Sequence, residues 1–185
     1  GKKYGEINLV IAHLGSGISV SAHRKGRMID VNNANNEGPF AAERCGGLPV
    51  SGLVDLCHSG RFSHREMKDM LTRKGGVFAY LGTKDMAEAE TRALGEDTQA
   101  RLVLEAMAYQ VAKEIGAMSA VLAGDVDRII ITGGMAHSEY ITGMIVDRVK
   151  RFAPVEVAPG EEELPALVQG ALRVLRGEEE AGEYV

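Results

Sequence analysis

Two glycine-rich turns, each directly after an apolar stretch, have the composition of phosphate-binding loops. The first is Gly15-Ser16-Gly17, which follows an apolar run that ends beside His13. Glycine has no Cβ, so its backbone N–H groups can approach a phosphate closely. Glycine pairs also close ordinary β-hairpins. By itself this turn therefore leaves phosphate binding and simple hairpin formation open, and a nucleotide is the first ligand to test.

The second turn, Gly133-Gly134, joins a predicted strand over 128–132 to a predicted helix over 138–152. A phosphate, or the purine and ribose of a nucleotide, can lie against such a junction, because a helix N-terminus offers N–H groups without helical partners. A tight strand-to-helix turn without a ligand is the alternative. The segment is not the dinucleotide-binding fingerprint, which needs a third glycine, an early βαβ position and an acidic residue about 20 positions on.

Arg44 and Glu162 are charged residues that could complete a phosphate site. Arg44 lies in the loop 37–53, and an arginine on such a loop can clamp a phosphate or a carboxylate with two hydrogen bonds, although an exposed arginine without a role is commoner. Glu162 precedes a predicted helix over 163–176, where the helix dipole favours carboxylates. The alternative for Glu162 is Mg²⁺, which binds one or two carboxylates together with substrate phosphates.

The histidines and cysteines do not predict a zinc site, because their spacings match no recognised ligand pattern. His13 is the one histidine placed to meet a ligand, since it lies at a strand end beside the glycine turn. His23 falls within a predicted strand and is expected to face solvent.

Hydrophobic periodicity predicts the elements that position these residues. Residues 7–31 alternate at period two around two glycine turns, which is typical of an antiparallel three-strand meander. Helices are expected over 50–58, from the capping box at Ser63 to Gly75-Gly76, and over 99–123. From residue 125 strands alternate with helices, which indicates a parallel sheet. The predicted fold class is α/β, with a mixed sheet, a meander followed by β-α-β-α, and helices on both faces.

Composition limits the classes of protein. The 185 residues, 45% of them hydrophobic, suit one domain or one large lobe of a two-lobed protein. The formal net charge of −5, without a basic stripe, argues against nucleic acid as a partner. No apolar run approaches the roughly 20 residues that span a bilayer, so no membrane partner is expected. Two unpaired cysteines and no secretory leader indicate a cytoplasmic protein.

Four segments, in this order, resemble those of acetate and butyrate kinases, the latter more closely: NLVIAHLGSGISVSAHRKGRMIDVNNA, EGPFAAERCGGLPVSGLVDLC, ITGGMAHSEYI and APGEEELPALVQGALRVL. These kinases belong to the acetate kinase, sugar kinase, Hsp70 and actin superfamily. The resemblance implies a ribonuclease H-like, actin-type ATPase lobe. Residues 1–177 would form a single carboxy-terminal nucleotide-binding lobe, its amino-terminal lobe absent, and 178–185 a flexible acidic tail.

The resemblance also implies roles for particular residues. Arg44 corresponds to the arginine that meets the carboxylate and stabilises the transferring phosphoryl group, and Glu162 to the glutamate associated with Mg²⁺. Asp85 falls near a D-x-R nucleotide element whose arginine is replaced here by Ala87. The residues implied to contact ATP or ADP are His13, Gly15, Ser16, Gly17, Asp85, Gly133, Gly134, Met135 and His137.

The implied reaction is reversible phosphoryl transfer between ATP and butyrate, or a related short-chain fatty acid, which yields an acyl phosphate. A carboxylate is already ionised at neutral pH, so the reaction needs positioning and charge screening more than a general base. Arg44 and Mg²⁺ would supply that screening. The chain is expected to be inactive without its amino-terminal lobe and to form a dimer or larger homo-oligomer. The alternatives are a non-catalytic nucleotide-binding or dimerisation module of the same fold, and a sugar kinase-like lobe.

Overall fold

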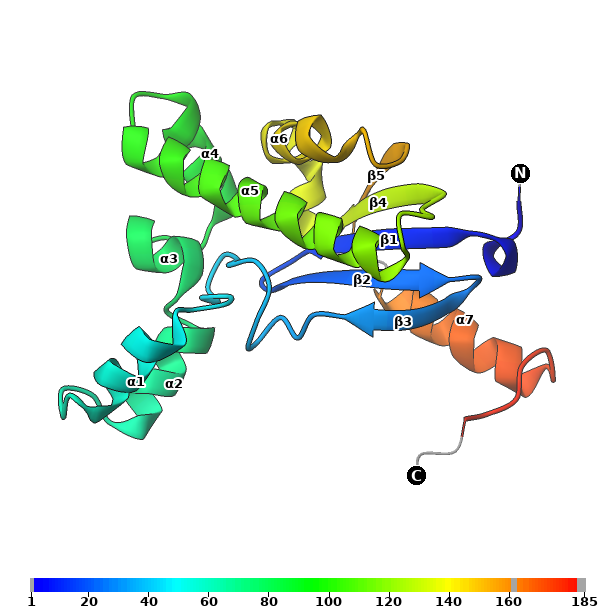
Figure 1. Cartoon of the computed structure of the whole chain (residues 1–185), viewed down its shortest axis with the longest axis horizontal. Helices are drawn as coiled ribbons and strands as arrows, with labels where there is room; N and C mark the ends of the chain where they lie inside the picture. Colours follow the sequence, from blue (N-terminus) through cyan, green and yellow to red (C-terminus); the bar gives the residue numbers. More distant parts are fainter. Residues whose placement is uncertain (1, 161–162, 183–185) are drawn as a thin grey trace.

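A five-stranded mixed sheet forms the centre of the protein (Figure 1). The computed structural model describes residues 2–160 and 163–182. The strands lie in the order β3-β2-β1-β4-β5. Their bounds are β1 (Asn8–Leu14), β2 (Ile18–Arg24), β3 (Arg27–Val31), β4 (Arg128–Gly133) and β5 (Val155–Pro159). The pairs β1–β2 and β2–β3 are antiparallel, whereas β1–β4 and β4–β5 are parallel. The predicted meander and mixed sheet are therefore confirmed.

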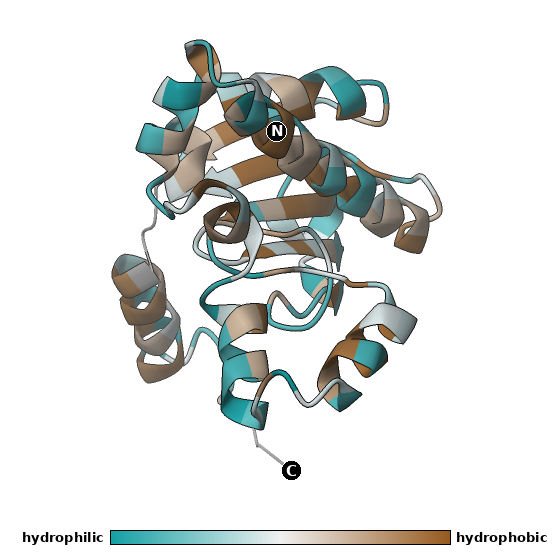
Figure 2. Ribbon diagram, turned by 90° about the vertical axis from the view of Figure 1, so that its left-hand side faces the viewer, coloured by the Kyte–Doolittle hydropathy of each residue, from teal (hydrophilic) through white to brown (hydrophobic). Residues whose placement is uncertain are grey.

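The core lies between one face of this sheet and a long helix, α5 (Thr98–Val121), which crosses the strands (Figure 1). Alternate residues of β1, β2 and β4 lie on the face of the sheet that α5 covers and are fully buried, because successive side chains of a strand face opposite sides. These residues are Val10, Ala12, Leu14, Ile18, Val20, Ala22, Ile129 and Ile131. Figure 2 shows the resulting hydrophobic centre as brown strands.

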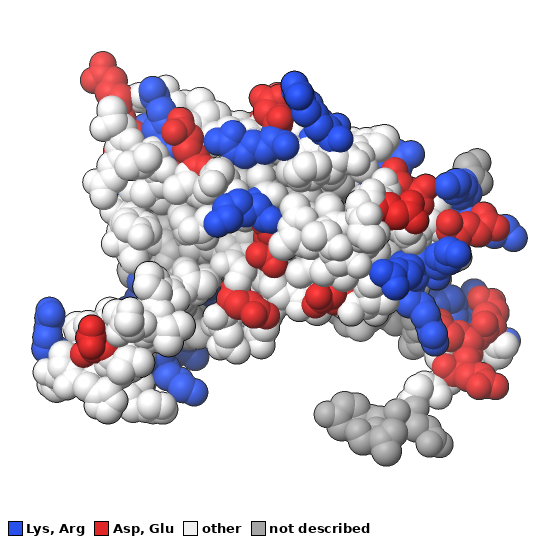
Figure 3. All heavy atoms as spheres, in the orientation of Figure 1, with Lys and Arg blue, Asp and Glu red and all other residues white. Residues whose placement is uncertain are grey.

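Further helices surround this core. α4 (Met86–Leu94) and α6 (Glu139–Val149) pack on α5, and α3 (Gly76–Leu81) contacts its first half. α1 (Val50–His58) and α2 (His64–Thr72) form an arm that projects from the body (Figures 1 and 3). α7 (Glu163–Leu175) lies on the opposite side of the sheet from α5 (Figures 1 and 2), so helices occur on both faces as predicted. No described helix is long and apolar enough to cross a membrane.

The helix predictions hold at most ends and fail between residues 76 and 94. The Ser63 capping box is present, since Ser63 N donates to Glu66 Oε2 at 2.8 Å and Glu66 N to Ser63 Oγ at 3.3 Å. α2 ends at Thr72, slightly before the predicted glycine pair. Helices α3 and α4, and the 3₁₀-helices η1 (Tyr4–Glu6) and η2 (Gly134–His137), were not predicted.

The predicted acidic tail is described only in part. Residues 178–182 are exposed, and within them Glu179 pairs with Arg173 Nε at 2.9 Å. Residues 183–185 lie outside the described part of the chain. On the face shown in Figure 3, basic and acidic side chains are interspersed.

The prediction that His23 faces solvent is wrong. Only 8% of His23 is exposed, because η1 folds back over the strand that carries it. The Tyr4 hydroxyl lies 2.9 Å from His23 Nδ1, and the Ser21 hydroxyl lies 2.9 Å from Nε2. The covering segment is separated from β2 in sequence, so strand periodicity did not indicate it.

We expect the burial of His23 to make stability fall at mildly acidic pH. Burial lowers the pKa of His23 below its ordinary value of 6.5. Below about pH 6.5 the unfolded chain therefore binds a proton that the folded chain resists, so the free energy of unfolding decreases as pH falls toward the lower folded pKa. Urea unfolding between pH 8 and pH 5 measures this. His23→Gln, which keeps a hydrogen-bonding side chain, should flatten the profile, and equal slopes in both proteins would contradict the expectation.

Candidate nucleotide and phosphoryl-transfer site

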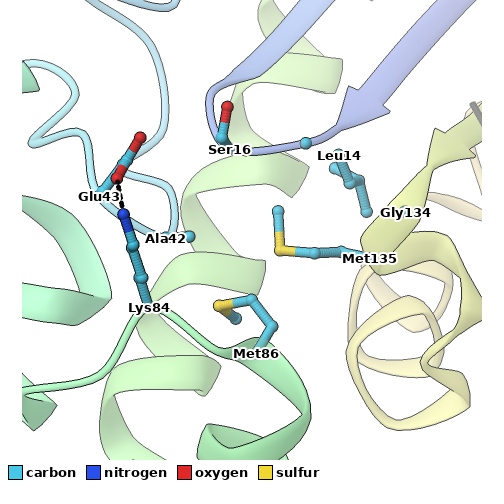
Figure 4. Close-up of a pocket in the computed structure, with 9 residues that line it drawn as sticks. Leu14, Ser16, Ala42, Glu43, Lys84, Met86, Gly134 and Met135 are labelled. Atoms are coloured by element: carbon cyan, nitrogen blue, oxygen red, sulfur yellow. Dashed lines mark hydrogen bonds and ion pairs between the residues drawn. The ribbon is translucent and has the colours of Figure 1, made fainter. Parts of the chain in front are cut away.

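The two glycine turns meet at one edge of the sheet. β1 and β4 are parallel neighbours, so their carboxyl ends lie together, with His13 paired to Thr132. A cavity of about 390 Å³ opens at this edge (Figure 4). It is lined by Leu14, Gly15, Ser16, Ala42, Glu43, Lys84, Met86, Gly134 and Met135. Ligand pockets of open α/β sheets commonly lie at this end of the strands.

A second cavity, of about 460 Å³, continues the first toward α6. The two share Met86, Gly134 and Met135, and the second also reaches His137 and Ser138. Together they form one groove that runs from the first glycine turn to the start of α6. Five of the predicted nucleotide-contacting residues line it: Gly15, Ser16, Gly134, Met135 and His137.

Gly133 holds the two strand ends together. Its φ of +97° lies outside the range that side chains favour, and a Cβ there would lie 2.6 Å from the Leu14 carbonyl oxygen. On the other side, Gly133 exchanges backbone hydrogen bonds of 3.2 and 3.3 Å with Gly160. Gly133 is buried, so it shapes the groove from beneath.

His13 and Asp85 lie near the groove without lining it. His13 is half-buried, and its Nε2 would lie 3.1 Å from a Cβ placed on Gly15. Asp85 caps α4, because its carboxylate accepts hydrogen bonds from Ala87 N at 2.9 Å and Glu88 N at 3.2 Å. Asp85 thus has a structural role, and its contact with a nucleotide stays a prediction.

Tight backbone packing fixes the loop that carries Arg44. Within the loop, the Ala41 N–H donates to the Arg44 carbonyl oxygen at 3.0 Å. Two further backbone hydrogen bonds, each of 3.0 Å, tie the loop to α2 and its end: Gly75 N donates to Glu43 O, and Cys45 N donates to Leu71 O. The glycine pair that follows α2 makes this packing possible, since a Cβ on Gly75 would lie 2.7 Å from Cys45 N. The loop is therefore held between the end of α2 and the start of α3.

The Arg44 side chain, which is partly exposed, reaches the first glycine turn. A Cβ on Gly17 would lie 2.7 Å from the guanidinium carbon of Arg44. The structure thus brings Arg44 together with the 15–17 turn, although 27 positions separate Gly17 from Arg44 in the sequence. An arginine beside a glycine turn can meet an anion that the turn holds.

Lys84 is a candidate functional residue that the sequence analysis missed. It is the one cationic side chain among the described residues that line the 390 Å³ cavity. Its Nζ lies 3.1 Å from Glu43 Oε2, shown as the dashed line in Figure 4. Because 67% of the Lys84 side chain is exposed, the pair contributes only about 0.2–1 kcal/mol, and a phosphate can compete for the lysine. Lys84 belongs to no motif, and its position directly before Asp85 was the only signal available.

Metal ligands are not gathered in the described part of the site. Among the side chains that the structure describes, no three from His, Cys, Asp or Glu residues lie close enough together to hold a metal ion. Glu162, the predicted Mg²⁺ residue, lies outside the described residues. The carboxylate that lines the 390 Å³ cavity is Glu43, which is paired with Lys84.

Solved structures show which class of protein has this architecture. An acetate kinase from Porphyromonas gingivalis superposes with a TM-score of 0.83 at 21% identity, over 94% of this chain and 50% of that one. A ROK hexokinase from Thermus thermophilus superposes with a TM-score of 0.54 at 15% identity, over 95% of this chain and 60% of that one. The chain therefore has the ribonuclease H-like, actin-type ATPase fold that acetate kinases and ROK sugar kinases share.

Sequence comparison then gives the family. The model of the acetokinase family matches residues 1–158. A protein named probable butyrate kinase from Thermotoga petrophila is 54% identical over 184 residues, which are 100% of this chain and 51% of that protein. Butyrate kinase 1 of Clostridium acetobutylicum is 50% identical over 185 residues, 100% of this chain and 52% of that protein. This chain belongs to the acetokinase family, and it spans about half the length of these curated relatives.

Proposed function

We propose that this chain is the carboxy-terminal, nucleotide-binding lobe of a carboxylate kinase. The enzyme would transfer a phosphoryl group reversibly between ATP and butyrate, or a related short-chain fatty acid, through an acyl phosphate. The observation that carries the proposal is the placement of Arg44 against Gly17, in the same turn whose Gly15 and Ser16 line the groove. The relatives named butyrate kinase at 50–54% identity support the carboxylate as acceptor.

The residues of the groove suit this chemistry. Backbone N–H groups of Ser16 and Gly17 would hold a phosphate, while Gly134 and Met135 would contact the nucleoside. Arg44 would screen the repulsion between the carboxylate and the phosphoryl group and stabilise the charge that develops during transfer. When a nucleotide binds, Lys84 would give up its ion pair with Glu43 and bind a phosphate oxygen instead. Bound Mg²⁺ would neutralise phosphate charge, with Glu162 as the candidate ligand.

The test is formation of an acyl phosphate by the whole enzyme. With ATP, Mg²⁺ and butyrate, hydroxylamine should trap butyryl hydroxamate in amounts that grow with time. A panel of acetate, propionate, butyrate and longer acids defines the acyl preference. A set of sugars tests the sugar kinase alternative, which the family match does not favour. No product with any short carboxylate would refute the proposed function.

The alternative is a module that binds nucleotide without turnover. Calorimetry with ADP on the 185-residue chain measures binding, and the hydroxylamine assay on the same chain measures turnover. We expect binding without turnover for this chain alone, because the curated relatives are about twice as long. Turnover by this chain alone would show that a second lobe is dispensable.

An apolar surface on the arm, α3 and α5 suggests a second copy of the chain as partner. We propose that the enzyme is a dimer through this surface. Val50, Val54, Tyr80 and Leu102 are 75%, 51%, 59% and 65% exposed. A mostly apolar cavity of about 750 Å³ lies beside them, between the arm, α3 and α5. Such exposed apolar patches mark interaction sites.

Leu102→Glu is expected to convert the dimer to a monomer, because the interface would then bury an unpaired carboxylate. Analytical ultracentrifugation over a range of protein concentrations measures the change. Met28→Glu is the matched control, since Met28 is 58% exposed on β3, on a different element from the proposed surface. A wild-type monomer at all concentrations would contradict the proposal.

A further inference from the structure

We infer that Gly17 is a positioning residue for Arg44: the space left by its missing Cβ is where the guanidinium group rests. This inference deepens the proposed function and rests on it, since Arg44 is the group proposed to meet the reacting anions. It assigns to Gly17 a task distinct from the phosphate contact that its place in a glycine turn predicts.

The contact between the two residues is close. A Cβ on Gly17 would overlap Nη1 of Arg44 and would lie 2.7 Å from Cζ and 3.0 Å from Cδ. The φ of Gly17 is not in the left-handed region, so its backbone conformation would accept alanine. Glycine at this position therefore provides space for the Arg44 side chain. It is not needed for a backbone conformation that other residues avoid.

The backbone on the Gly17 side is held firmly. Gly17 O accepts from Gly15 N at 3.1 Å, and the next residue, Ile18, is fully buried and pairs with Leu14 across the hairpin. Asn32, itself buried, donates to Ile18 O at 3.1 Å and accepts from Val20 N. The turn has little freedom to retreat from a larger side chain.

The backbone on the Arg44 side is held as firmly, by the hydrogen bonds to Ala41, Leu71 and Gly75 described above. An added methyl group at position 17 must therefore be accommodated by the Arg44 side chain. The guanidinium would turn away from its present place, and two parallel hydrogen bonds to an anion depend on its orientation.

Gly15 is the matched control in the same turn. A Cβ on Gly15 would approach the end of the His13 side chain, with Nε2 at 3.1 Å, and no Arg44 atom is among its near neighbours. Its φ is likewise outside the left-handed region. Gly15→Ala thus perturbs the turn and any phosphate contact without displacing the arginine.

A double-mutant cycle on the whole enzyme tests the inference. Gly17→Ala should lower kcat/KM for the carboxylate by about 10²-fold, the cost of misplacing a group at the reacting centre by about 1 Å, and should change KM for ATP no more than Gly15→Ala does. In the Arg44→Ala background, Gly17→Ala should cost almost nothing more, because the group it displaces is gone. The fold losses in kcat/KM from Gly15→Ala and Arg44→Ala should instead multiply in the double variant, because the two changes act independently. Multiplicative losses from Gly17→Ala and Arg44→Ala would overturn the inference.

A crystal structure of the Gly17→Ala variant separates this inference from the proposed function. The guanidinium of Arg44 should be displaced from the turn while the 41–45 backbone keeps its place, whether or not the enzyme phosphorylates a carboxylate. An Arg44 side chain still seated against residue 17 would overturn the inference even in an active enzyme. If the Arg44 side chain is displaced in the variant but the wild-type enzyme has no carboxylate kinase activity, the proposed function is refuted and the inference about Gly17 stands.

Discussion

Arg44→Ala is expected to lower kcat for acyl phosphate formation by about 10³-fold, the low end of the effect of arginines that stabilise a transferring phosphoryl group. Affinity for ADP should change little, because the glycine segments and Met135, which line the groove, are untouched. The hydroxylamine assay measures the first quantity and calorimetry with ADP the second.

Two further variants sharpen this prediction. Arg44→Lys keeps the positive charge and removes the two-pronged geometry, so it should recover only part of the lost rate. Arg61→Ala is the control, since Arg61 is an exposed arginine of the arm that lies over the Phe62 ring at 5.4 Å. Equal loss of rate and of ADP affinity in Arg44→Ala would mean that Arg44 supports the fold or nucleotide binding, against the role proposed here.

Gly133→Ala is expected to destabilise the protein by about 2–5 kcal/mol and to weaken nucleotide binding. About 1–2 kcal/mol comes from placing a side chain in an extended positive-φ conformation that only glycine adopts readily, and about 1–3 kcal/mol from overpacking. The overpacking arises because the new Cβ would lie 2.6 Å from Leu14 O and 2.7 Å from Leu14 N. Relief of this clash must move β4 away from β1 and so widen the groove. Urea unfolding and calorimetry with ADP measure the two effects.

Gly143→Ala in α6 is the matched control for Gly133→Ala. Apart from its chain neighbours and the backbone of its own helix, no atom lies within 4 Å of a Cβ at Gly143, and the residue is in the middle of a helix. The substitution should be neutral or stabilise the protein by about 0.5–1 kcal/mol, because alanine has the higher helix propensity. If Gly133→Ala is tolerated as well as Gly143→Ala, the turn at 133 does not hold the strand ends together.

Much of the secondary structure follows from short-range patterns. The meander follows from the alternation of apolar and polar residues on both sides of two glycine turns. Helices α1 and α5 begin and end within two residues of their predicted limits. These elements depend on contacts between near neighbours in the chain, which periodicity and capping residues report directly.

The errors and omissions arise where a residue has a second role or is covered by a segment distant in the sequence. Gly75-Gly76 was interpreted only as the end of a helix, yet Gly75 also precedes α3, whose first residue has a φ of +56°. The role of Asp85 as the cap of α4 was missed, while the nucleotide contact that the resemblance implies for Asp85 stays a prediction. His23 was misplaced because η1, which buries it, precedes β1 in the chain and is not a neighbour of β2.

Local sequence alone therefore accounts for the strands, most helices and the residue types that could bind a phosphate. The tertiary structure decided how they meet: the parallel pairing of β1 with β4 joins Leu14 to Gly133, and two anchored loops bring Arg44 to Gly17 and Glu43 to Lys84. These pairs are separated by between 27 and 119 positions. Contacts between residues so far apart in the sequence form only when the whole sheet and its covering helices pack together, because no local backbone preference brings the two residues of a pair toward each other.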